Sequence, residues 1–153
     1  MIIWNEDYST GIETIDQQHK LLIEQINRLE EVVANTKPSE LEIRFASRLV
    51  SFLDSYAKMH FGLEEKCMEA YRCPAHALNE EQHKQFAGFI ERFKHKFDAE
   101  GFSVEAFKEL YEMTSAWITR HILRVDGQLF ACVRAAHPPN TMNDTMVRAN
   151  QCA

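Results

Sequence analysis

Apolar residues recur along most of the chain at steps of three and four positions, which is the spacing of one face of an α-helix. The first such stripe covers 12–33, and the others cover 45–71, 76–97 and 107–125. Ser39 and Glu42 have the spacing of a capping box, Pro74 breaks the second stripe, and Ser103 can cap the fourth. No alternating run of strand length interrupts the stripes, so we expect an all-α chain.

Four long helices joined by short loops predict an antiparallel, up-down-up-down four-helix bundle. Residues 1–11 precede the first stripe and contain Trp4 and Tyr8, so we expect this N-terminal arm to pack along the side of the bundle. Residues 137–153 carry no sustained stripe. We therefore predict a domain over 1–136 and a tail or linker over 137–153.

Charge and composition exclude several classes of function. The 153 residues carry a net charge of −6 without a compensating cluster of Lys and Arg, so we expect no nucleic-acid partner. No apolar run approaches about 18 residues, and the start lacks the pattern of a secretory signal, so we expect no membrane partner and a cytoplasmic location. The four cysteines form no Cys-x-x-Cys pair, and we interpret them as free thiols without a metal role. They are Cys67, Cys73, Cys132 and Cys152.

Ionisable side chains occupy core-facing positions on all four stripes. An unpaired imidazole or carboxylate in a core is costly, so these residues need a partner. In an antiparallel bundle the four histidines fall at nearly one level, and imidazole with carboxylate suits first-row divalent metals, iron, manganese and zinc among them. The sequence therefore predicts a metal site, and its two carboxylates favour a dinuclear one. The predicted ligands are His19, His60, Glu64, His83, His121 and Asp126.

The spacing of these residues adds detail. His60 and Glu64 are four residues apart, which stacks them on one helix face. His121 and Asp126 are five apart, a rotation of about 140°, so they need either a side chain that reaches across the bundle or a local π-bulge. The ferritin-like alternative requires two Glu-x-x-His motifs, and only 80–83 matches one, so that pattern fails.

The residues around these positions resemble those of bacterial hemerythrins, which are non-haem di-iron, dioxygen-binding bundles. The resemblance covers about residues 4–133, and implies two iron ions bridged by Glu64 and Asp126 together with an oxo or hydroxo bridge. It assigns His19 and His60 to one iron, and His83 and His121 to the other. The matching segments are Trp4, Gly11-Ile12, Ile15-Asp16-x-Gln18-His19, His60-Phe61-x-x-Glu64-Glu65, His83-x-x-Phe86 and Trp117-Ile118-x-x-His121-Ile122-x-x-x-Asp126-x-x-Leu129.

One position departs from the family pattern, which has a histidine four residues before His83. This chain has Asn79 there. Asn79 is either a polar helix residue that has lost the family role or a residue linked to the metal through a water. His76 lies seven residues before His83, about 10 Å along a helix against about 6 Å for the usual pair, so we interpret it as a helix-start or channel residue.

Two classes of function follow from the resemblance, with a merely structural bundle as a third. One is reversible O2 binding for storage, delivery or sensing, and the other is an enzyme that reduces O2, peroxide or nitric oxide. Because Asn79 removes an imidazole, we expect an extra open coordination position and greater reactivity towards O2 and nitric oxide. This favours a sensor-type or reactive binding domain over a bulk carrier or an enzyme. Residues 137–153 could lead to a C-terminal signalling domain.

Overall fold

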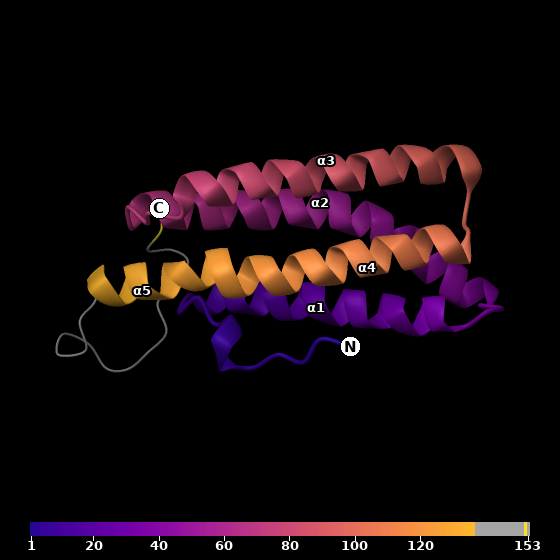
Figure 1. The fold of residues 1–153 in the computed structure, drawn as a ribbon, viewed down its shortest axis with the longest axis horizontal. Coiled ribbons are helices and arrows are strands. Elements are labelled where there is room, and N and C mark those ends of the chain that lie inside the picture. The colour runs from indigo at the N-terminus through magenta and orange to yellow at the C-terminus, as the bar shows by residue number, and fades with distance from the viewer. Residues whose placement is uncertain (137–151, 153) are drawn as a thin grey trace.

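The computed structural model describes residues 1–136 and 152. Four long helices run antiparallel along one axis, with α2 beside α3 and α1 beside α4 (Figure 1). The all-α four-helix bundle expected from the sequence is therefore confirmed, and no strand occurs among the described residues. The elements in chain order are the 3-10 turn η1 (Glu6–Tyr8), α1 (Glu13–Ala34), α2 (Glu40–Ala70), α3 (His76–Glu100), α4 (Val104–His121), the π-helical segment η2 (Ile122–Asp126) and α5 (Gly127–Ala136).

The helix starts follow from local side-chain chemistry. The Ser39 hydroxyl accepts from the backbone N–H of Glu42, and the Glu42 carboxylate accepts from the N–H of Ser39, which completes the predicted capping box. Ser103 likewise accepts from the N–H of Ala106 at the start of α4. Between α3 and α4, Gly101 has a φ of +79°, a conformation that suits glycine. These signals set the helix lengths and so align the four helices.

The apolar core is divided into two clusters. The larger one fills the bundle from the α1–α2 loop towards its middle and includes Ile26, Leu53 and Phe107. The smaller one lies at the opposite end and includes Ile15 and Leu129. The predicted polar residues lie around the boundary between the two clusters, where they form a buried polar layer.

The N-terminal arm packs on the side of the bundle, as expected. Its main anchor is the Asp16 carboxylate on α1, which is 1% exposed. This carboxylate accepts hydrogen bonds from the Ser9 hydroxyl and from the Thr10 backbone N–H and hydroxyl, each at 2.7 Å. The backbone of Ile2 adds a reciprocal pair of bonds with the Asn27 amide. The arm is therefore held at both of its ends.

The expectation of free thiols is wrong, because all four cysteines are paired in the structure. Cys67 on α2 bonds to Cys152, and Cys73 in the α2–α3 loop bonds to Cys132 on α5. The paired residues are 85 and 59 positions apart, and such pairing depends on the tertiary fold rather than on spacing. The predicted tail, 137–153, lies outside the described residues except for Cys152. Within the described part of the chain, no helix is long and apolar enough to cross a membrane.

Candidate metal centre

The six predicted ligands converge in the polar layer from all four long helices and η2. Each is at most 3% exposed. Their donor atoms form two groups, each with all donors within 4.8 Å of one another. Glu64 belongs to both groups. One group comprises His19, His60 and Glu64, and the other comprises Glu64, His83, His121 and Asp126.

Each carboxylate directs its two oxygens to opposite sides of the cluster. Glu64 Oε1 lies 3.8 Å from His19 Nε2, whereas its Oε2 lies 3.3 Å from His83 Nε2. Asp126 Oδ2 lies 3.4 Å from His19 Nε2, whereas its Oδ1 lies 3.0 Å from His121 Nε2. Both carboxylates therefore span the space between the His19 side and the His83–His121 side.

The π-helical segment brings Asp126 under His121. Its backbone bonds span five residues, as in the bond from the Gly127 N–H to the Ile122 carbonyl, so positions five apart share a face. Of the two arrangements that the sequence left open, the local π-bulge is the one that occurs. A Cβ at Gly127 would lie 3.3 Å from the Ile122 carbonyl oxygen, so glycine suits the tight end of the bulge.

Several buried donor atoms of the cluster have no hydrogen-bond partner. Buried polar atoms in proteins are nearly always paired, and exceptions call for an explanation such as an ion. The nitrogen and oxygen donors here are those that divalent iron, manganese or zinc accepts. A bound cation would satisfy these atoms together, so the residues present fit a metal. The unpartnered atoms include both ring nitrogens of His19, Glu64 Oε1 and both carboxylate oxygens of Asp126.

Burial also keeps the cluster poor in charge when no cation is bound. It raises the pKa of Glu64 to about 8, with the nearby Asp126 adding to the rise, and raises the pKa of Asp126 to about 8. Burial lowers the pKa of His60, His83 and His121 to about 4. Each shift disfavours the charged form, and a cation would reverse the shifts of the two carboxyls.

Three of the histidines have their Nδ1, the ring nitrogen that points away from the cluster and is called the outer nitrogen below, in contact with a side chain of the neighbouring helix. His60 Nδ1 is 2.8 Å from Gln18 Oε1, and His121 Nδ1 is 2.7 Å from Gln82 Oε1. His83 Nδ1 is 2.8 Å from the carboxylate of Glu65. Sequence reasoning did not assign these three residues a role. Each directly precedes or follows a predicted ligand, so adjacency to a ligand was the available signal.

Aromatic rings cover the other faces of the imidazoles. Phe61 stacks on His83 at a ring-centroid distance of 3.7 Å, and Trp117 stacks on His121 at 4.1 Å. Trp4 of the N-terminal arm lies 6.5 Å from the His19 ring. Apolar aromatic side chains therefore surround the cluster and limit the access of water.

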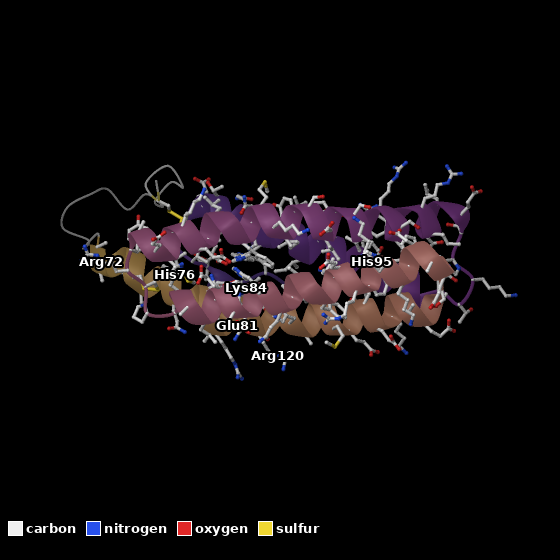
Figure 2. The ribbon with its side chains drawn as sticks, turned by 90° about the horizontal axis from the view of Figure 1, so that it is seen from above. Arg72, His76, Glu81, Lys84, His95 and Arg120 are labelled. Atoms are coloured by element: carbon white, nitrogen blue, oxygen red, sulfur yellow. A yellow bond between two sulfur atoms is a disulfide. The ribbon has the colours of Figure 1, made fainter. Side chains whose placement is uncertain are left out.

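Asn79 faces the cluster rather than solvent. It is fully buried on α3, its Nδ2 lies 3.5 Å from Glu64 Oε2, and its Oδ1 has no hydrogen-bond partner. His76, by contrast, is at the outer surface near the start of α3 (Figure 2). Its side chain is 31% exposed and lies 4.0 Å from the carboxylate of Glu80, and it belongs to neither donor group. His76 therefore lies at the helix start and apart from both donor groups, which agrees with its interpretation as a helix-start residue.

Comparison with known proteins identifies the family. Residues 10–133 match the Hemerythrin HHE cation binding domain, which is most of the chain. The chain belongs to the hemerythrin family. It is thus a non-haem iron-binding domain of the hemerythrin type, and the cluster of His, Glu and Asp side chains fits such a site.

Curated relatives of this hemerythrin-family chain cover nearly its whole described length. A bacteriohemerythrin of Stenotrophomonas maltophilia (strain R551-3) is 31% identical over 137 residues, which are 90% of this chain and 84% of the relative. A bacteriohemerythrin of Clostridium acetobutylicum is 26% identical and covers 84% of this chain and 98% of its own length. A crystal structure of wild-type hemerythrin has a TM-score of 0.73 at 22% identity, over 87% of this chain and 98% of that one, a likeness of fold.

Proposed function

We propose that this chain binds two iron ions bridged by Glu64 and Asp126, and that it binds O2 at that centre. The observation that carries the proposal is that each carboxylate turns one oxygen towards His19 and the other towards His83 or His121. In this assignment His19 and His60 hold one iron, and His83 and His121 hold the other. When bound, the reduced iron pair supplies the electrons with which O2 is held or reduced.

The residues around the cluster have separable tasks in this proposal. Gln18, Glu65 and Gln82 fix the rings of three histidines, so that each presents its Nε2 to the metal. Phe61 and Trp117 cover the rings and slow the entry of water, which protects a bound small ligand from side reactions.

Asn79 favours a sensor-type or reactive domain over a bulk carrier. Its side chain is buried beside Glu64 Oε2, the oxygen that faces His83, so the position lies on the His83–His121 side of the cluster. Because Asn79 places an amide where the family has a histidine, this side of the cluster has one imidazole ligand fewer. The Oδ1 of Asn79 has no hydrogen-bond partner in the protein, so it can hold a water by hydrogen bonding. A labile water in place of an imidazole leaves an additional exchangeable position, which suits O2 and also nitric oxide.

The proposal is tested by loading the metal-free protein with Fe²⁺ under anaerobic conditions, followed by metal analysis and optical spectra before and after air. We expect two iron ions per chain and an air-dependent absorption band that decays within the experiment. An iron content of one or fewer would contradict the dinuclear centre. A band that persists and disappears on deoxygenation would instead identify an O2 carrier, and steady consumption of O2 would identify an enzyme.

Asn79→His is the matching variant for the open position. Four residues before His83, the new imidazole would lie on the same helix face, so we expect the air-dependent band to last longer than in the parent. Equal lifetimes in both proteins would refute the role of Asn79. A substitution at the exposed His95 on the same helix is the control and should leave the lifetime unchanged.

The expected cytoplasmic location and a signalling partner joined through 137–153 stay predictions. The two disulfides are a feature more common in oxidising compartments, so cell fractionation with detection of the thiol state is a direct check of the location.

A further inference from the structure

The three outer-nitrogen contacts of the cluster differ in chemistry. Gln18 and Gln82 offer neutral amide oxygens to His60 and His121, whereas Glu65 offers a carboxylate to His83. All three contacts have nearly equal lengths, between 2.7 and 2.8 Å. The difference among them is therefore in charge rather than in distance.

A carboxylate acts on an imidazole in two ways that an amide does not. It only accepts hydrogen bonds, so the proton of His83 must lie on Nδ1, and the lone pair of Nε2 points to the cluster. It also draws that proton more strongly, which makes the imidazole a better donor to a metal. The Nε2 of His83 lies 3.3 Å from Glu64 Oε2 and 3.0 Å from His121 Nε2, so this donor is directed into the cluster.

Glu65 acts on the same side of the cluster as Asn79. Both His83 Nε2 and Asn79 Nδ2 lie beside Glu64 Oε2, at 3.3 Å and 3.5 Å. Asn79, which cannot supply an imidazole, and His83, whose partner Glu65 carries a carboxylate, therefore lie on the same side of the cluster. We propose that Glu65 is a positioning residue that strengthens His83 as a metal donor, on the side of the cluster where Asn79 supplies no imidazole. This inference rests on the proposed function, because it needs a metal at the His83–His121 side.

The ring of His83 has a second restraint, which separates the effect of charge from that of orientation. Phe61 stacks on it with an interplanar angle of 11°. Glu65→Gln keeps the size of the side chain and an oxygen acceptor for Nδ1, so the ring stays in place while the charge is lost. Glu69→Gln removes an exposed charge from the same helix, and Glu69 belongs to neither donor group, which makes this variant the matched control.

The test measures Zn²⁺ affinity by competition with a chromophoric chelator, and the midpoint potential of the iron-loaded protein. For Glu65→Gln we expect the second equivalent of Zn²⁺ to bind about 10 to 100 times more weakly, with the first equivalent unchanged. The iron potential should become more positive, because a weaker donor stabilises the oxidised metal less. Glu69→Gln should match the parent in both measurements.

A double variant moves the carboxylate instead of removing it. Glu65→Gln combined with Gln82→Glu keeps the net charge of the parent and places the carboxylate against His121, the other histidine on that side. We expect this variant to recover most of the lost affinity and to return the potential towards that of the parent. A purely structural role of Glu65 would not produce this recovery.

Three outcomes would overturn the inference. The first is an unchanged affinity and potential in Glu65→Gln, and the second is a fall in the melting temperature of the metal-free protein with an unchanged potential. The third is a double variant as weak as the single one. A parent chain that binds no second metal would contradict the proposed function itself, and it is recognised from the parent titration alone.

Discussion

Replacement of Asp16 by alanine should detach the N-terminal arm from the bundle. The Asp16 carboxylate accepts three hydrogen bonds, from the Ser9 hydroxyl and from the Thr10 backbone N–H and hydroxyl. Thr10 is fully buried, so in Asp16→Ala its two donors would have neither a protein acceptor nor water. Ser9 is only half-buried and can turn to solvent.

The expected loss follows from the two donors left without a partner. A buried donor that loses its partner costs about 1 to 3 kcal/mol, so two of them cost about 2 to 6 kcal/mol. That is a large part of the total stability of a domain, about 5 to 15 kcal/mol. For a chain of this length each kcal/mol lowers the melting temperature by about 2 to 4 °C, so we expect a fall of at least about 4 °C.

The measurement is thermal unfolding of the metal-free protein, followed by circular dichroism. Asp16→Asn, which keeps one oxygen acceptor, should fall between the parent and the alanine variant. Asp7→Ala is the control, because Asp7 is an exposed acidic residue in the same arm. If Asp16→Ala melted within about 2 °C of this control, the carboxylate would not be the anchor of the arm.

Three further predictions concern the cluster and the crosslinks. His60→Ala should lower the metal content below two per chain and reduce the rise in melting temperature on adding metal, and unchanged values would contradict its role. Loss of the Cys67–Cys152 disulfide in Cys67→Ser should lower the free energy of unfolding by about 2 to 4 kcal/mol but leave the metal content unchanged. Loss of iron in this variant would refute the prediction. In the metal-free protein the folded chain retains protons on Glu64 and Asp126 up to about pH 8, whereas the unfolded chain releases them near pH 4. The histidines are neutral in both the folded and the unfolded state above about pH 6.5, so the free energy of unfolding should fall from about pH 6.5 to about pH 8. Melting curves recorded with and without Zn²⁺ check that bound metal removes this fall.

The fold was predictable because the relevant signals are local. The three-and-four spacing of apolar residues, the Ser39–Glu42 capping box and the break at Pro74 each depend on residues close in sequence. Ionisable residues on apolar stripes predicted the cluster for the same reason, since a helix places positions four apart on one face. His60 and Glu64 are the clearest case.

The features that sequence reasoning did not predict depend on contacts between distant segments. The disulfides join residues 85 and 59 positions apart, and no spacing rule indicates such pairs. The contact between Glu65 and His83 likewise crosses from α2 to α3. The π-bulge before Asp126 could be identified only from the backbone of the structure, because a side chain that reaches across the bundle is compatible with the same five-residue spacing.

The division of the core into two apolar clusters explains how the bundle can contain so costly a polar layer. The unpartnered atoms of His19, Glu64 and Asp126 destabilise the metal-free protein at one level only. Apolar packing on both sides of that level, with residues such as Leu53 and Leu129 fully buried, offsets this cost without contacting a metal. Stability and metal affinity are therefore carried by different residues. A substitution at the metal site, such as asparagine in place of the family histidine at position 79, can therefore alter the metal environment without loss of the fold.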